Sequence, residues 1–254
     1  MGWSLRLFFK ALGAALGVAL LFVLFHPLDL STPQGITPRA TPAFAGATPT
    51  ATPYSLRVGL VAGHTGGDDP GAICPDGITE AQVNARIARH AARLLESIGV
   101  QVDVLQEFDP RLQGYQALAL VSVHADSCQV SPEHSGFKLA ISDALQREGT
   151  PQQRARARRL KECLKTWYQD MTKLDYDPYT ITRDMREYHA FKEVDPDTPA
   201  VIIEVGFLAG DYELLVNRPE VPARGIALGI LCFARTENIL LPYPEENLPP
   251  LPTP

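Results

Sequence analysis

Short apolar runs alternate with amphipathic helical segments across residues 55–241, and this alternation constrains the fold more than any other feature. The pattern predicts strands at 57–62, 100–105, 117–124, 136–141 and 200–205, and helices at 79–98, 151–174 and 224–239. The runs at 117–124 and 200–205 are apolar on both faces, which is typical of central strands covered on either side. We therefore predict a single α/β domain with an open, mostly parallel mixed sheet flanked by helices.

The segment 79–98 carries the clearest local helix signal. Thr79 can accept a hydrogen bond from the first turn, and Gln82 can return one, which together form a capping box. Apolar residues then recur at helical spacing up to Ile98, and Gly99 follows as a stop.

The two ends of the chain differ in composition from the domain. Residues 1–30 hold an uncharged apolar run at 11–25 behind Arg6 and Lys10, and they predict either a transmembrane anchor or a cleaved signal segment. Residues 31–54 repeat Thr-Pro and are interpreted as an extended linker, and 242–254 as a disordered Pro-rich tail. Both readings of the N-terminus place the domain on the extracytoplasmic side, membrane-anchored or secreted.

Charge and cysteine content exclude some classes of function. The formal net charge of −6 does not suit binding to a phosphate backbone, so we expect no nucleic-acid partner. No Cys-x-x-Cys pair occurs, which disfavours a thiolate zinc site. Cys163 and Cys232 fall on predicted helices and are expected to be unbonded core residues.

Four polar residues stand where a sheet of this kind forms its site, beyond the carboxyl ends of the strands. His64 follows the first strand, His124 ends the third, and Glu204 lies near the end of the fifth. Glu80 opens the helix at 79–98. If the strands are parallel neighbours, all four side chains meet at one edge.

Two histidines and a carboxylate make a catalytic zinc site with an open position for water, and a further carboxylate can act as general base. Each residue also has an ordinary explanation, since a histidine after a strand is commonly a loop residue and Glu80 suits a helix N-terminus. Glu204 is the hardest to explain that way, because an unpaired carboxylate among apolar residues costs several kcal/mol. His134 and His189 lie in predicted loops and are weaker candidates for the cleft.

Four segments, taken together and in order, resemble the zinc-dependent N-acetylmuramoyl-L-alanine amidases of the "amidase 3" family. Residues 63–72 (GHTGGDDPGA) resemble its opening His-Gly-Gly-x-Asp-x-Gly-Ala element, and 77–88 resemble its Glu-containing helix start. Residues 122–126 (SVHAD) are similar to Ser-Ile-His-Ala-Asn, and 199–208 (PAVIIEVGFL) to Pro-Ala-Val-Leu-Val-Glu-x-Gly-Phe. The resemblance covers roughly residues 57–238.

The resemblance implies one Zn²⁺ per chain, with His64, Glu80 and His124 as ligands and Glu204 as the catalytic glutamate. The implied reaction is hydrolysis of the amide between N-acetylmuramic acid and L-alanine in peptidoglycan, with peptidoglycan or a muropeptide as the substrate. We expect a monomer that reaches the membrane through its N-terminal segment. Two alternatives stay open: a zinc hydrolase of another peptide or amide, and a non-catalytic wall-binding module.

The sequence departs from the family pattern at three positions. Thr65 interrupts the His-Gly-Gly element, Asp126 stands where Asn is usual, and Lys138 falls on a strand that commonly carries an acidic residue. Lys138 and Asp126 are therefore candidates for substrate binding, with Lys138 either contacting a carboxylate on the peptide stem or simply facing solvent.

Two cysteines lie in the loops that follow the candidate histidines. Cys74 lies ten residues after His64, and Cys128 four residues after His124. Because both loops should reach the same edge of the sheet, we predict a Cys74–Cys128 disulfide that braces the site. Two free thiols are the alternative.

Overall fold

A five-stranded mixed sheet forms the centre of the domain in the computed structural model, which describes residues 56–239. The strands are β1 (Arg57–Ala62), β2 (Gln101–Gln106), β3 (Ala119–Asp126), β4 (Lys138–Ala140) and β5 (Ala200–Phe207). Their order is β2-β1-β3-β5-β4, and β4 alone runs antiparallel, against β5. The predicted α/β class and mostly parallel sheet are confirmed, and the five predicted strands all occur, with ends shifted by up to two residues.

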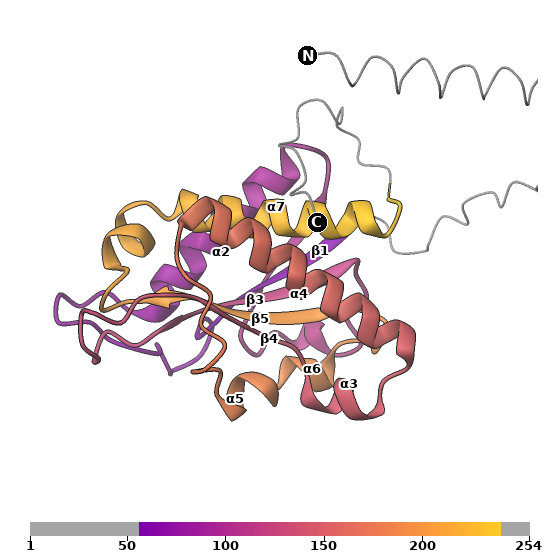
Figure 1. The fold of residues 1–254 in the computed structure, drawn as a ribbon, viewed down its shortest axis with the longest axis horizontal. Helices are drawn as coiled ribbons and strands as arrows, with labels where there is room; N and C mark the ends of the chain where they lie inside the picture. Colours follow the sequence, from indigo (N-terminus) through magenta and orange to yellow (C-terminus); the bar gives the residue numbers. More distant parts are fainter. Residues whose placement is uncertain (1–55, 240–254) are drawn as a thin grey trace, which may run out of the picture. The chain divides into compact units, whose positions relative to one another are not determined.

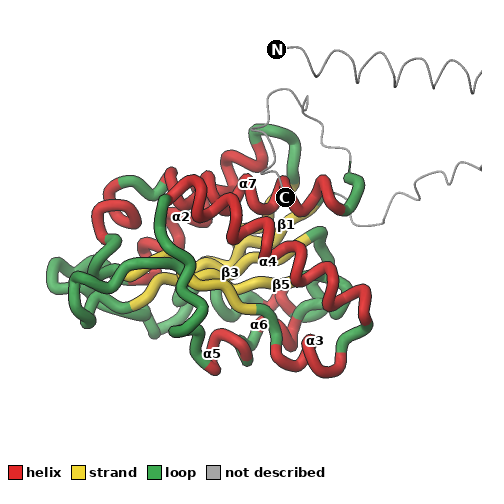
Figure 2. The backbone as a smooth tube through the Cα atoms, in the orientation of Figure 1, coloured by secondary structure: helices red, strands yellow, loops and turns green. Residues whose placement is uncertain are grey.

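Helices cover both faces of the sheet (Figures 1 and 2). One face carries α2 (Glu80–Glu96) and α4 (Pro151–Thr172), and α7 (Glu220–Thr236) packs against both of these helices. The other face carries the 3-10 turn η1 (Pro110–Leu112) and the short helices α5 (Arg183–Arg186) and α6 (Ala190–Glu193). The remaining elements are α3 (Asp143–Glu148) and the π-helical turn η2 (Glu213–Asn217).

Strand β3 shows why both faces must be covered. Ala119, Val121 and Val123 enter the core beneath α2, α4 and α7, whereas Leu120 enters the smaller core on the other face. Successive side chains of a strand point to opposite faces, so a continuous apolar run needs apolar partners on both. This burial keeps β3 and its neighbour β5 in the middle of the sheet.

Local sequence signals set the ends of the long helices. Thr79 and Gln82 form the predicted capping box at the start of α2, and Thr150 and Gln153 form another at α4, which then begins with Pro151. On α7, Gly225 and Gly229 face α4, where an added Cβ would meet the Cα atoms of Tyr168 and Leu164 at 2.9 and 2.7 Å. The two helices therefore approach closely along this pair of glycines.

A disulfide joins these same two helices. Cys163 of α4 and Cys232 of α7 are bonded, with their Cα atoms 5.7 Å apart. The expectation that both are unbonded core residues is wrong, because the close packing of α4 on α7 brings two distant helical positions within bonding reach. Nothing in the spacing of the two cysteines reveals that contact.

The segments predicted at the ends of the chain, 1–30, 31–54 and 242–254, lie outside the described residues. Between residues 56 and 239, no helix combines the length and the apolar character that crossing a membrane requires.

Replacing Cys163 and Cys232 by alanine should lower the free energy of unfolding by about 2–4 kcal/mol, because the bond closes a long loop in the unfolded chain. Urea unfolding of the metal-free protein, with and without the double substitution, measures this difference. An unchanged midpoint would show that the bond does not contribute to stability.

Candidate metal centre

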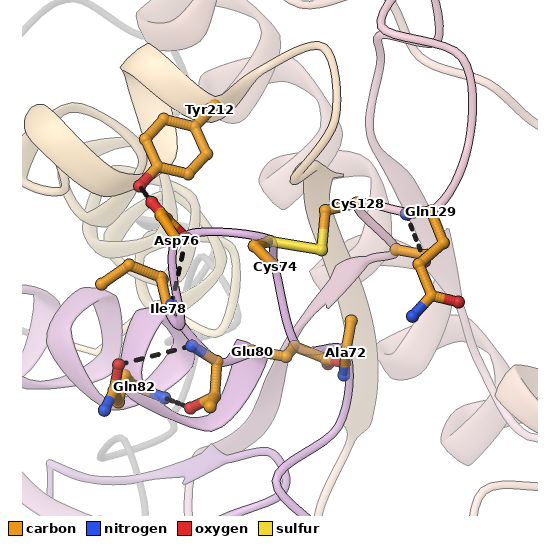
Figure 3. The surroundings of a disulfide bond; sticks show 11 residues. Ala72, Cys74, Asp76, Ile78, Glu80, Gln82, Cys128, Gln129 and Tyr212 are labelled. Carbon is orange, nitrogen blue, oxygen red and sulfur yellow. Dashed lines mark hydrogen bonds between the residues drawn. A yellow bond between two sulfur atoms is a disulfide. The ribbon is translucent and has the colours of Figure 1, made fainter.

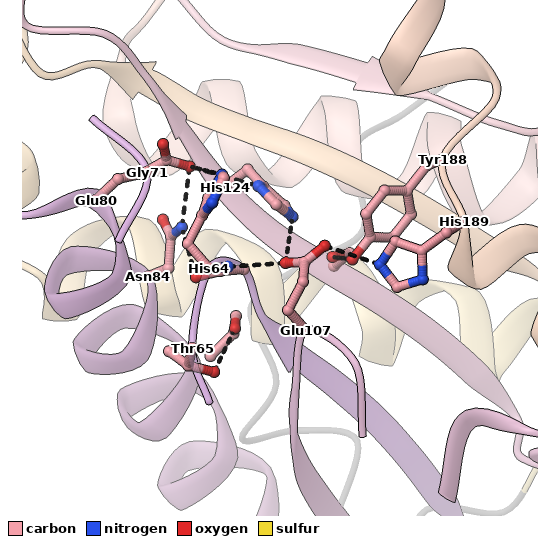
Figure 4. Close-up of polar contacts among 12 residues, drawn as sticks. His64, Thr65, Gly71, Glu80, Asn84, Glu107, His124, Tyr188 and His189 are labelled. Carbon is pink, nitrogen blue, oxygen red and sulfur yellow. Dashed lines mark hydrogen bonds and ion pairs between the residues drawn. The ribbon is translucent and has the colours of Figure 1, made fainter. Parts of the chain in front are cut away.

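The parallel strands β1, β3 and β5 bring the predicted residues to one edge of the sheet. His64 lies two residues beyond β1, His124 lies in β3, and Glu204 lies in β5 as the direct Cα partner of His124. Glu80 is the first residue of α2, which packs on β1 and β3. The structure therefore gathers the four side chains at the carboxyl ends of the central strands, where sites of open α/β sheets form. Figure 4 shows three of them, His64, Glu80 and His124, turned toward one another.

Glu80 is held in place by backbone and side-chain donors. The residue is only 6% exposed. Oε1 accepts hydrogen bonds from the Ala125 N–H and from Asn84 Nδ2, each at 3.1 Å, and Oε2 accepts one from the Ala72 N–H at 3.2 Å. Burial alone would raise the pKa of Glu80, but the facing histidines, with His124 foremost, and these donors hold it below its ordinary value. Glu80 is thus a fixed, ionised carboxylate.

His64, Glu80 and His124 have the spacing of metal ligands. Each offers one ligand atom, and the three atoms lie within 4.8 Å of one another. His64 Nε2 lies 3.5 Å from Glu80 Oε1, and His124 Nδ1 lies 3.4 Å from the same oxygen. Tetrahedral zinc with bonds of roughly 2.0–2.1 Å places neighbouring ligand atoms about 3.3 Å apart. The donor set and its distances therefore fit a zinc ion bound by three protein ligands.

The other nitrogen of each ring faces a carboxylate. His64 Nδ1 lies 3.2 Å from Asp69 Oδ2, and His124 Nε2 lies 3.3 Å from Glu107 Oε2. Such outer carboxylates fix the orientation and tautomer of metal-binding histidines. They leave His64 Nε2 and His124 Nδ1 as the nitrogens directed at Glu80.

Glu107 is a site residue that the sequence analysis did not identify. It directly follows β2, so the rule that singled out His64, a polar residue just past a strand, applies to it as well. The partners of Glu107 at the site also include His189, whose Nε2 lies 2.9 Å from Glu107 Oε1. His189, a weak candidate from sequence, thus reaches the centre through Glu107, and its ring also packs on Tyr188, which contacts the His124 ring.

Glu204 carries an unpaired carboxylate oxygen. Its Oε2 is buried and has no hydrogen-bond partner within the described part of the chain. Burial first, and then the nearby carboxylates of Asp126 and Glu80, raise the pKa of Glu204 to about 8, against the opposing effects of His124 and Lys138. Burying an unpaired acid lowers the stability of the folded protein, so the presence of Glu204 at this position points to a chemical role.

Lys138 and Asp126 contact each other. Lys138 is 3% exposed, and its Nζ lies 2.5 Å from Asp126 Oδ2 and 4.8 Å from the centre of the Phe207 ring. The alternative of a solvent-facing Lys138 is wrong, because β4 pairs with β5 and Lys138 lies beside Glu204 in that ladder. The two departures from the family pattern thus form one ion pair next to the candidate base.

The structure joins Cys74 to Cys128, with Cα atoms 5.6 Å apart (Figure 3). Cys74 lies in the loop that leads into α2, where its N–H donates to the Ile78 carbonyl at 2.8 Å. Cys128 lies just beyond β3. The bond therefore connects the segment that supplies Glu80 with the segment that supplies His124.

A surface cleft opens beside the centre. His64, Thr65 and Asp69 line one part of it, and Glu107 and Phe108 line another. Phe108 is 72% exposed and stacks on the His189 ring, with centroids 4.4 Å apart. A substrate can approach His64 along this cleft.

Binding of a metal should release a proton from His124. Burial lowers the pKa of His124, but the Glu107 and Glu80 carboxylates raise it to about 10 in the metal-free protein, so the ring is doubly protonated at neutral pH. Because a ligand nitrogen must be deprotonated, each proton released makes zinc affinity rise roughly tenfold per pH unit. Chelator competition between about pH 6 and 8 measures this slope. A dissociation constant that does not change with pH would contradict the assignment.

Comparison with known proteins identifies the family of the chain. The family model for N-acetylmuramoyl-L-alanine amidase (Amidase_3) matches residues 58–231. A comparison with curated proteins gives no match.

Solved amidase structures share the fold. The CwlD amidase of Clostridioides difficile, solved with the GerS lipoprotein, is 22% identical, with a TM-score of 0.55 over 71% of this chain and 98% of its own. AmiC2 of Nostoc punctiforme is 23% identical, with a TM-score of 0.51 over 72% and 99%. Ami1 of Mycobacterium smegmatis is 17% identical, with a TM-score of 0.59 over 72% and 98%. With the family model spanning most of the domain, the chain belongs to the N-acetylmuramoyl-L-alanine amidase family.

Proposed function

We propose that this protein is a zinc-dependent amidase that cleaves the bond between N-acetylmuramic acid and L-alanine in peptidoglycan. The observation that carries the proposal is a His64–Glu80–His124 donor set at zinc-ligand spacing beside the unpaired carboxylate of Glu204. Membership of the amidase family supports the choice of substrate and bond.

The residues at the sheet edge divide the chemistry between them. His64, Glu80 and His124 would hold the ion, which when bound lowers the pKa of a water and polarises the scissile carbonyl. Glu204 takes the proton from the attacking water and delivers it to the departing amine of L-alanine. Burial raises the pKa of Glu204 to about 8 in the metal-free protein, and a bound dication would lower it toward the neutral range in which a carboxylate can both accept and return a proton.

Asp126 and Lys138 are proposed to act together toward the substrate. Asp126 keeps about a fifth of its side chain exposed (22%), whereas Lys138 is enclosed. Asp126 is therefore the member of the pair that can meet a substrate amide, and Lys138 holds it in position. Direct contact between Lys138 and a stem carboxylate would require the ion pair to open.

An extracytoplasmic location is part of the proposal. Both described disulfides require an oxidising compartment to form and persist. Peptidoglycan also lies outside the cytoplasm, so the location and the substrate agree. The predicted anchor or signal segment at 1–30 would deliver the domain there.

Glu204→Gln should retain zinc and lose activity. The amide keeps the shape of the side chain but cannot accept the water proton, so turnover should fall by roughly 100-fold or more. Zinc content and hydrolysis of purified peptidoglycan are measured on the same preparation, with Glu96→Gln, an exposed position at the end of α2, as the charge-matched control. Turnover of Glu204→Gln near that of the wild type would exclude Glu204 as the base.

The bond that is cleaved distinguishes the proposal from its two alternatives. Digestion of peptidoglycan should expose new free α-amino groups on L-alanine, activity should disappear with a chelator, and zinc should restore it. Mass spectrometry of the released fragments identifies the bond. Cleavage of a different amide would indicate another zinc hydrolase, and binding to the wall without cleavage would indicate a wall-binding module.

A further inference from the structure

We propose that Glu107 is a positioning residue that holds both histidines of the metal centre, and that His189 and Glu193 orient it from the opposite side. The inference rests on the proposed zinc site and adds a set of outer residues to it. Residue 107 lies outside the four family-like segments described above.

Glu107 contacts both histidines through one oxygen. The residue is 7% exposed. Oε2 accepts a hydrogen bond from the His64 backbone N–H at 2.8 Å and lies 3.3 Å from His124 Nε2 (Figure 4). Since His64 follows β1 and His124 lies in β3, a single carboxylate connects the two segments that supply the histidines.

The contact to His64 supports a constrained backbone. His64 has a φ of 60°, in the left-handed region that side chains other than glycine seldom occupy. The hydrogen bond from its N–H to Glu107 stabilises this conformation, which turns the imidazole toward Glu80. Without that acceptor, the residue is free to return to ordinary backbone angles and carry its ring away from the site.

The contact to His124 selects a tautomer. His124 Nδ1 faces Glu80, so a neutral ring that donates its Nδ1 lone pair to a metal must carry its proton on Nε2. Glu107 Oε2 lies 3.3 Å from this Nε2, an ion-pair distance, although Nε2 completes no hydrogen bond within the described residues of the metal-free protein. An outer carboxylate in this position orients the ring and makes it a better ligand.

Glu107 is itself held by a second imidazole. Its Oε1 lies 2.9 Å from His189 Nε2, while His189 Nδ1 lies 2.7 Å from Glu193 Oε1. The His189 ring also stacks on Phe108, at 4.4 Å, and packs at a tilt against Tyr188, at 4.5 Å. These contacts form a chain from Glu193 through His189 and Glu107 to His124. Glu193 and His189 belong to α6 and the residue before it, on the other face of the sheet.

The test measures zinc affinity of the metal-free protein by competition with a chromophoric chelator, together with the unfolding midpoint of the same metal-free preparations. Glu107→Ala should weaken zinc binding by about 10–100-fold, the usual effect of removing an outer partner. Glu107→Gln, which keeps an acceptor oxygen and the shape of the side chain, should lose less. His189→Ala should also weaken zinc binding, and Glu96→Gln should bind zinc as the wild type does.

The outcomes separate positioning from mere structural support. The inference would be overturned if Glu107→Ala bound zinc with wild-type affinity. If Glu107→Ala does not fold, wild-type affinity in both Glu107→Gln and His189→Ala would overturn it. A lower unfolding midpoint with unchanged zinc affinity would also overturn it, because the residue would then support only the fold. A wild-type protein that binds no zinc would overturn the proposed function, and this inference with it. Wild-type zinc binding with no hydrolysis would overturn the proposed function while leaving the positioning role measurable.

Discussion

The buried carboxylate of Glu80 is the interaction on which the rest of the site depends. A charge in this position is stable only if donors surround it, because burying it unpaired costs several kcal/mol. The donors come from three different segments: Ala72 in the loop before α2, Asn84 one turn along the helix, and Ala125 in β3. The hydrogen bonds to the Glu80 carboxylate therefore hold these segments together, and with them the two histidines that face Glu80.

The edge of the sheet concentrates acidic side chains, and the structure balances their charge locally. Glu80, Glu107 and Asp126 lie within this region together with the largely protonated Glu204, and the surroundings exclude much of the water that would screen them. Lys138 offsets part of this charge by pairing with Asp126 beside Glu204. A bound dication would offset more of it, which gives a physical reason for a metal at this point and for the histidine rings that accompany it.

Local patterns predicted most of the scaffold. Apolar runs identified β3 and β5 most clearly because these two strands are buried on both faces, and the capping box identified the start of α2 because its contacts span only three residues. Glu204 stood out for a related reason, since the cost of an acid among apolar neighbours can be read from the chain itself. The four family-like segments identified the candidate ligands and Glu204 as one set of site residues from the sequence alone.

By itself, the sequence determined the fold class, the strands and the candidate ligand set, because these follow from periodicity, burial and short-range contacts. Only the tertiary structure decided which distant residues meet. Glu107 and His189 lie 82 positions apart, and their contact depends on the strand order and on the segment that crosses the opposite face. The Cys163–Cys232 bond and the Lys138–Asp126 pair likewise depend on how helices and strands pack, which spacing along the chain does not encode.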